Sequence, residues 1–229
     1  MIALESVCKR YIRVHHGEEA LADLNLDILR GEYLSIQGGP GSGKTVLLRV
    51  LGMLEMPSSG SYLFEDYDVG ALPEAERARI RAEHFGFVFG NIDLVPELSA
   101  LENVMLPMAY AGLSRPKRKA RARLLLDEMG MGEGYDSPPS RLMPIERQLV
   151  AIARALANEP DLILADEPTN GLDLEDGREA IRTLESLNEK GLTLVLFTRS
   201  EELASRARRR LRIRAGRLDP NQRTIGGKA

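Results

Sequence analysis

A short glycine-rich stretch constrains this chain more than any other part of its sequence. Residues 38–45 read Gly-Gly-Pro-Gly-Ser-Gly-Lys-Thr, which is the spacing of a phosphate-binding loop. Residues 32–37 before it are typical of a short strand and residues 46–51 after it of a helix, which is the order that such a loop requires. Glycines let the backbone turn tightly, so that successive amide N–H groups converge on an anion at the positive end of the helix. The stretch predicts that the chain binds a nucleoside triphosphate.

The loop combines a backbone cradle with two side chains that have separate roles. Lys44 is expected to reach the outer phosphates as a positive charge, and the Thr45 hydroxyl to ligate a magnesium ion. The alternative, a glycine-rich turn beside an unrelated lysine, does not account for the flanking strand and helix. The expected nucleotide-binding residues are Gly38, Gly39, Pro40, Gly41, Ser42, Gly43, Lys44, Thr45 and Val46.

Later in the chain, a run of apolar residues ends in two acids. Residues 162–165 are Leu-Ile-Leu-Ala, and Asp166 and Glu167 follow them directly. Such a run is typical of a fully buried parallel strand, and ligands bind at the carboxyl ends of the strands in open α/β sheets. We expect Asp166 to bind the magnesium ion, usually through a water molecule, and Glu167 to be the catalytic residue that polarises the attacking water. An exposed acidic turn after a core strand is the alternative, and the intact phosphate loop argues against it.

Composition limits the classes of partner. The formal charge is −3, the pI is near 5.8, aromatic residues make up 5% of the chain and there is no Trp. These values argue against nucleic acid as a partner and against binding of anionic lipid through bulk charge. A single cysteine excludes an internal disulfide and fits a reducing compartment. No apolar run approaches the roughly 20 residues of a transmembrane helix, so we expect a cytoplasmic chain that reaches a membrane only through a partner.

The pattern along the chain predicts an α/β fold in a single domain, residues 1–229. The N-terminal residues alternate as antiparallel strands do, which predicts an N-terminal antiparallel β subdomain. Residues 91–156 are mostly helical in pattern and are punctuated by prolines. This predicts a helical subdomain inserted between core segments 1–90 and 157–229.

Arginines are concentrated near the C-terminus. Leu211 and Ile213 alternate there with Arg210, Arg212 and Arg214. This alternation predicts a half-buried edge strand whose arginines face water, in preference to a nucleic-acid patch.

Together these motifs resemble the nucleotide-binding subunits of ABC transporters, in particular the macrolide-export and lipoprotein-release branch (MacB-like and LolD-like ATPases). The resemblance covers essentially the whole chain. It includes Leu-Gly-Met-Leu at 51–54, Glu-Asn-Val at 102–104 and Val-Ala-Ile-Ala-Arg-Ala-Leu at 150–156. It implies a P-loop NTPase with a RecA-like mixed sheet core, ATP and Mg²⁺ as cofactors, and a dimer that works with a membrane permease. It also implies that Tyr11 stacks on the adenine ring.

Several positions depart from the family pattern. In that family a Leu-Ser-Gly-Gly-Gln signature of one subunit closes over the ATP held by the other, whereas residues 142–146 here read Leu-Met-Pro-Ile-Glu. The hydroxyl and both glycines are absent, and the Glu146 carboxylate falls near the place expected for the γ-phosphate. Gly90 replaces a glutamine that senses the metal ion and the permease, and Arg199 replaces the switch histidine. Val46 stands where a second hydroxyl is usual.

Two functions remain open at this point. The first is an ABC-type ATPase subunit that couples ATP binding and hydrolysis to a separate permease of an exporter, peripheral at the inner face of the cell membrane. Because Gly90, residues 142–146 and Arg199 are altered, we expect slow or partner-dependent turnover, in a dimer with itself or with an ordinary ABC ATPase subunit. The second is a non-catalytic pseudo-ATPase subunit that regulates or scaffolds a complex. A soluble ABC protein acting on DNA or ribosomes is disfavoured, because the span from Lys44 to Asp166 leaves no room for a long coiled coil.

Overall fold

The computed structural model describes residues 1–12, 17–65 and 67–219. It divides into two compact units, one made of Met1–Arg81 with Thr193–Ala229 and the other of Ala82–Leu192. Within the described residues, no helix combines the length and the apolar character that crossing a membrane demands.

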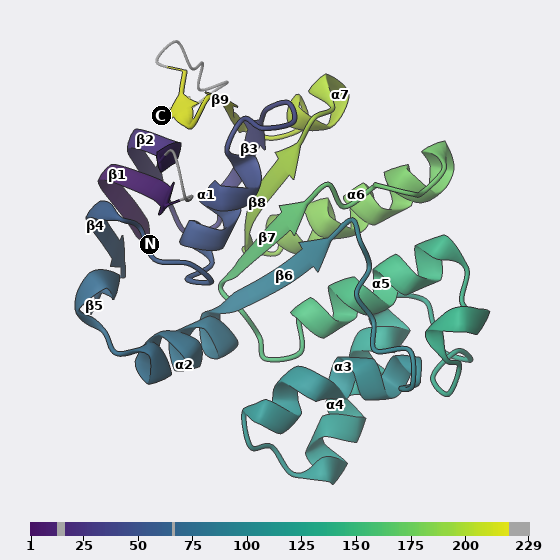
Figure 1. The fold of residues 1–229 in the computed structure, drawn as a ribbon. Helices are drawn as coiled ribbons and strands as arrows, with labels where there is room; N and C mark the ends of the chain where they lie inside the picture. The colour runs from purple at the N-terminus through teal and green to yellow at the C-terminus, as the bar shows by residue number, and fades with distance from the viewer. Residues whose placement is uncertain (13–16, 66, 220–229) are drawn as a thin grey trace. The chain divides into compact units, whose positions relative to one another are not determined.

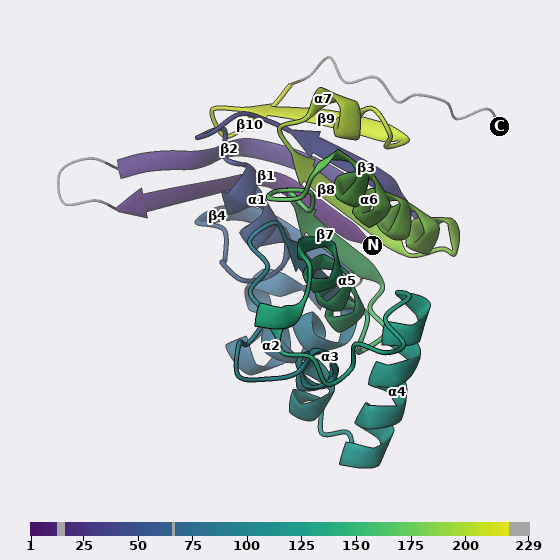
Figure 2. The same cartoon turned by 90° about the vertical axis from the view of Figure 1, so that its right-hand side faces the viewer.

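The first unit contains the expected antiparallel sheet, in the order β2-β1-β4-β5. Its strands are β1 (Ile2–Ile12), β2 (Gly17–Ile28), β4 (Ser59–Phe64) and β5 (Tyr67–Asp68). Figure 2 shows β1 and β2 side by side along their length, as their antiparallel pairing requires. The prediction of antiparallel strands at the N-terminus is confirmed.

A bulge explains an irregular apolar spacing in β1. Ile2, Leu4 and Val7 are all buried although the last step is three residues instead of two. The pairing with β2 shifts register between Leu4 and Val7, and Ser6 takes a φ of 47° there. The Ser6 N–H donates to Asn25 Oδ1 at 2.9 Å. The extra residue therefore keeps the apolar side chains on one face of the sheet.

A second group of strands in the first unit surrounds β3 (Tyr33–Gln37), which runs parallel to β8 (Thr193–Thr198) and to β9 (Arg209–Arg214). The prediction of a half-buried strand is confirmed for β9, because Leu211 and Ile213 are buried and the arginines that alternate with them are partly exposed. The prediction that β9 is the edge strand was wrong, because its C-terminal residues pair with β10 (Arg217–Leu218). Arg210 and Arg212 both contact Glu201, at 3.2 and 3.0 Å.

The helical segments in the described part of the first unit are α1 (Lys44–Leu51), η1 (Val69–Ala71), α7 (Glu201–Ala204) and most of α2 (Glu74–His84), which ends just beyond the boundary at Arg81. Figure 1 shows α1 starting directly after the loop that follows β3. The strand–loop–helix order predicted around the glycine-rich stretch is thus present.

The second unit contains two parallel strands and most of the helices. The strands are β6 (Phe85–Phe89) and β7 (Leu162–Asp166), which lie side by side in Figure 1. The helices are α3 (Ala100–Tyr110), α4 (Arg115–Glu128), η2 (Pro139–Arg141), α5 (Pro144–Ala155) and α6 (Leu174–Glu189). Every residue of 91–156 is described, and that segment forms helices and loops without a strand. The exact limits of a helical insertion at 91–156 stay a prediction, because the compact unit extends beyond them on both sides.

One buried side chain fixes the loop that leads into α3. Asn103 is fully buried, and its Oδ1 accepts the Val95 N–H at 2.8 Å. Its Nδ2 donates to the carbonyl oxygens of Val95, Leu98 and Ser99 at 3.2, 3.1 and 3.0 Å. Backbone groups of an irregular loop need such partners when they are withdrawn from water.

We therefore expect Asn103→Leu to lower the free energy of unfolding by about 2–4 kcal/mol, because it removes the partners of the Val95 N–H and the Leu98 carbonyl at nearly constant side-chain volume. Urea unfolding followed by circular dichroism measures this change. Asn158→Leu is the control, since Asn158 Nδ2 makes a contact at 2.9 Å to the Ala82 carbonyl from a half-buried position. Equal losses in the two variants would contradict a special role for Asn103.

Candidate functional site

The glycine-rich loop ends at a helix that is open at its N-terminus. Gly43 precedes α1 with a φ of 101°, a left-handed conformation that favours glycine. Among the described residues no side chain caps this end of α1, and its first turn contains no acid. Backbone N–H groups at such an end attract anions, and the helix dipole adds to the attraction.

The loop lines a pocket of about 500 Å³. The sequence-predicted residues that line it are Tyr11, Gly39, Pro40, Gly41, Ser42, Gly43, Lys44, Thr45 and Val46. Gly38 is buried behind the loop, and a Cβ there would come within 2.5 Å of Ser42 Oγ. The structure thus brings the predicted nucleotide-binding residues of the first unit together.

Two side chains of the loop are arranged as an anion site requires. The Ser42 hydroxyl is buried and has no hydrogen-bond partner among the described residues. Lys44 is 7% exposed, and its ammonium donates to the carbonyl oxygens of Gly38 and Gly39. A buried hydroxyl without a partner is costly, and an anionic oxygen in the pocket would accept its proton in a hydrogen bond. Thr45 is exposed at the same place.

The pocket also contains residues that the sequence did not single out. They are Glu19, Ala20, Ala215 and Gly216. Gly216 N–H donates to Ser42 O at 2.9 Å, and a Cβ on Gly216 would lie 2.6 Å from Ala20 O. The turn between β9 and β10 therefore braces the loop. Its only sequence signal is a glycine between two short strands, which any tight turn would explain.

Arg199 follows β8 at the same end of the sheet as the loop. Gly38 N–H donates to Thr198 O at 3.3 Å, so the chain enters the loop beside the end of β8. The Arg199 side chain is exposed, and its carbonyl accepts from Gln37 Nε2 at 3.5 Å. The residue in the switch position is thus placed next to the loop within the first unit.

The two acids lie in the second unit. Asp166 ends β7, and Glu167 follows with a φ of 46°, which is unusual for a residue other than glycine. Gly90 N–H donates to Asp166 O at 2.8 Å, and a Cβ on Gly90 would lie 2.2 Å from Glu167 O. Among the described residues no group of three or more His, Cys, Asp or Glu could hold a metal ion by itself. A magnesium ion shared by Thr45 and Asp166 remains a prediction.

The N-terminus of α5, the helix at the position of the family signature, is capped by the carboxylate of a residue in its own first turn. Pro144 begins α5, and Glu146 Oε2 accepts the Met143 N–H at 2.8 Å. Pro144 has no N–H to offer, and the Met143 side chain is 59% exposed. Unlike the start of α1, this helix end already has a negative group on it, which disfavours an additional anion.

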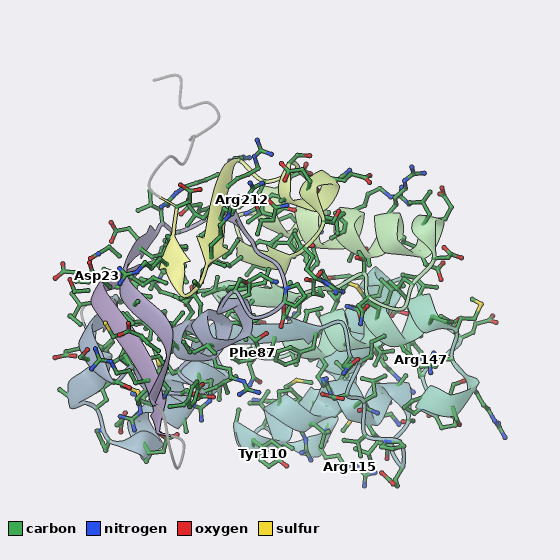
Figure 3. All side chains as sticks on the ribbon, turned by 45° about the horizontal axis from the view of Figure 1, so that its top comes forward. Asp23, Phe87, Tyr110, Arg115, Arg147 and Arg212 are labelled. Atoms are coloured by element: carbon green, nitrogen blue, oxygen red, sulfur yellow. The ribbon has the colours of Figure 1, made fainter. Side chains whose placement is uncertain are left out.

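A groove of about 830 Å³ lies between α3 and α4. Apolar side chains of α3, among them Leu101 and Met105, line it together with Arg115, Arg118 and Lys119 of α4. Arg115, labelled in Figure 3, is the first residue of α4. Glu102 and Asp136 also line it, so the groove combines an apolar lining with three basic and two acidic side chains.

Comparison with known proteins agrees with this geometry. A family model described as ABC transporter matches residues 21–170. The chain is 42% identical over 224 residues to the macrolide export ATP-binding/permease protein MacB of Bradyrhizobium diazoefficiens, covering 98% of this chain and 34% of the relative. It is 43% identical over 219 residues to MacB of Campylobacter jejuni, covering 95% of this chain and 33% of the relative. The chain therefore spans about a third of the length of these relatives.

Solved structures match over the whole chain. The ATP-binding cassette MJ0796, in a dimeric post-hydrolysis state bound to ADP and Pi, shares 35% identity and a TM-score of 0.90, with 100% of both chains covered. CbiO1 of Clostridium perfringens, part of an ABC transporter complex, shares 25% identity and a TM-score of 0.85, covering 98% of this chain and 88% of that chain. These matches confirm the predicted α/β fold of a P-loop NTPase. The names of these relatives and solved structures give no support to the prediction of a non-catalytic subunit.

Proposed function

This chain belongs to the ABC transporter family, and on that premise we propose that it binds and hydrolyses ATP to drive a membrane permease of an exporter. The MacB relatives combine an ATP-binding and a permease part under one name, and this chain corresponds to about a third of them. The pocket of the glycine-rich loop supports ATP as the ligand. The observation that carries the proposal is the buried Ser42 hydroxyl, which has no partner among the described residues, beside an uncapped helix end.

ATP and Mg²⁺ fit the residues present. Lys44 would neutralise charge on the outer phosphates, and the open end of α1 would donate backbone hydrogen bonds to them. Thr45 and Asp166 would hold the magnesium ion, which supplies further neutralisation of the phosphate charge when bound. Tyr11 would stack on the adenine ring. Glu167 would orient and polarise the water that attacks the γ-phosphate.

The chain would turn over ATP slowly by itself, or only with a partner. In a dimer that closes over ATP, the start of α5 would have to approach the γ-phosphate held by the other subunit. Glu146 already occupies the Met143 N–H, and its negative charge would face the phosphate. A partner with an intact Leu-Ser-Gly-Gly-Gln signature would supply the missing donors to the loop of this chain. A dimer with such a subunit is therefore preferred over a dimer of identical chains.

The groove between α3 and α4 is the proposed contact with the permease. An apolar lining flanked by three basic and two acidic side chains fits an amphipathic segment that carries charges of both signs. The chain would then lie at the inner face of the cell membrane, held there through the permease.

Steady-state hydrolysis of ATP with magnesium tests the proposal. We expect the purified chain to release phosphate, and Glu167→Gln to lower kcat by about 10²- to 10⁴-fold with ATP binding retained, because the amide cannot take up a proton. The rate is measured with the chain alone and with an equal amount of a family subunit that has the intact signature. Stimulation by that subunit is the result expected from the closed start of α5.

Two results would decide against the proposal. Tight ATP binding without turnover by the chain alone, and no rate in the mixture above that of the family subunit alone, would indicate a non-catalytic subunit. Undiminished turnover by Glu167→Gln alone would contradict the role of Glu167 if it is lost in Lys44→Met, and would indicate a contaminating ATPase if it persists there. A high rate for the chain alone would contradict the partner dependence while leaving the ATPase activity in place.

A further inference from the structure

We propose that Glu55 is a positioning residue that holds the Tyr11 ring in the orientation needed to stack on the base of the bound nucleotide. The inference rests on the proposed ATP site and assigns a role to a residue outside the phosphate loop. Glu55 is 44 positions away from Tyr11 in the sequence and contacts it directly through a hydrogen bond.

The Tyr11 side chain is held at two points. Its hydroxyl donates to Glu55 Oε2 at 2.6 Å. The Lys9 ammonium lies over the ring, 5.3 Å from its centroid, and also contacts Glu55 Oε2 at 3.4 Å. A side chain on a strand otherwise exchanges between rotamers, and these contacts select one of them.

Glu55 is itself anchored to the helix that starts at the phosphate loop. Its Oε1 accepts from Arg49 Nη1 at 3.0 Å, and its backbone N–H donates to Arg49 O at 3.1 Å. Arg49 lies in the last turn of α1, and Lys44 begins the same helix. The group that holds the Tyr11 ring is thus fixed to the element that presents the phosphate-binding lysine.

Tyr11 lines the nucleotide pocket, and the residues that hold it in place do not. Tyr11 belongs to the residues that line the pocket of the glycine-rich loop, whereas Lys9, Arg49 and Glu55 do not line that pocket in the described part of the chain. The side chain of Glu55 is 23% exposed and that of Lys9 is 16% exposed. Glu55 therefore acts on a ligand through the ring and makes no contact with it in the pocket.

The protonation states suit this arrangement. The hydrogen bond from Tyr11 is the largest of the causes that hold the pKa of Glu55 below its usual value, ahead of the pairing with Arg49 and Lys9. Burial, followed by the Glu55 carboxylate, raises the pKa of Tyr11 to about 12. At neutral pH the acceptor is charged and the donor keeps its proton, so that the bond is a charge-assisted one.

The test compares a ligand that has a base with one that does not. ATP and inorganic tripolyphosphate are each titrated into the wild-type chain and into Glu55→Leu by isothermal calorimetry. Without Glu55 the Tyr11 side chain must be ordered into one rotamer when ATP binds. We therefore expect ATP affinity to fall about 3- to 10-fold. Tripolyphosphate affinity is expected to stay within about twofold, because the phosphate loop is unchanged.

A double-mutant cycle shows whether Glu55 acts through the tyrosine hydroxyl. Tyr11→Phe keeps the ring and removes the hydroxyl, and we expect it to weaken ATP binding about as much as Glu55→Leu does. The double variant should bind ATP no more weakly than either single variant, since both substitutions remove the same hydrogen bond between Tyr11 and Glu55. Glu55→Gln keeps an acceptor for the hydroxyl and should retain part of the affinity.

Three results would overturn the inference. The first is unchanged ATP affinity in Glu55→Leu. The second is an equal loss for tripolyphosphate, which would indicate damage to α1 and the loop. The third is additive losses in the double variant. Failure of the proposed function is distinguishable from these, because it would appear as absent ATP binding by the wild-type chain.

Discussion

Lys44→Met is expected to weaken ATP binding by about 100-fold, or about 2.7 kcal/mol, with little change in the free energy of unfolding. Methionine retains an unbranched stem about as long as the aliphatic part of lysine but removes the charged ammonium. Lys44 is 7% exposed and bound to loop carbonyls, so its ammonium is already close to the place where phosphates would bind. Fluorescence titration with a labelled ATP analogue measures the affinity.

Lys190→Met is the matched control for this variant. Lys190 is an exposed residue at the end of α6, and its substitution should leave ATP affinity unchanged. An unaltered affinity in Lys44→Met would contradict the assignment of the pocket as a phosphate site. A loss accompanied by unfolding, seen by circular dichroism, would instead show that the lysine is needed for the loop to form.

Gly90→Gln is expected to lower kcat by about 10- to 100-fold, although it restores the residue that the family pattern has at this position. A Cβ on residue 90 would lie 2.2 Å from Glu167 O and 2.7 Å from the Cβ of Asn170. The backbone that carries Glu167 must therefore shift, and misplacement of a reacting group by about 1 Å can cost about 100-fold in rate. Phosphate release under the conditions that give the highest wild-type rate measures the change.

Gly86→Ala provides the matched control in the neighbouring strand β6. A Cβ there would lie 2.7 Å from Ala155 O, so this substitution also forces backbone to move. The backbone that it contacts belongs to Ala155 and not to Glu167. We expect it to lower the free energy of unfolding by about 1–3 kcal/mol and to leave kcat nearly unchanged. A higher rate in Gly90→Gln, or equal losses of kcat in both variants, would contradict the proposed packing of Gly90 on Glu167.

The local parts of this protein could be predicted from its sequence. The loop at 38–45 specifies its own turn, because glycines allow the required backbone and the flanking residues favour a strand and a helix. The strand at 162–166 followed the same logic, since an unbroken apolar run that ends in acids fits a buried strand with a polar end. In both cases the signal and the structure involve neighbouring residues. The departures at 142–146 were also visible in the sequence.

The sequence did not reveal contacts between distant residues. Glu55 reaches Tyr11, the Ala215–Gly216 turn braces Ser42, and β9 gains β10 as a neighbour in place of an open edge. The absence of a side chain at Gly90 looked like a loss, whereas the packing of that residue on Glu167 leaves no space for one. Local patterns depend on backbone preferences and periodicity, which neighbouring residues determine. Contacts between residues far apart in the chain depend on packing and on the need to satisfy buried polar groups. Both are properties of the folded chain, so no local pattern in the sequence reports them.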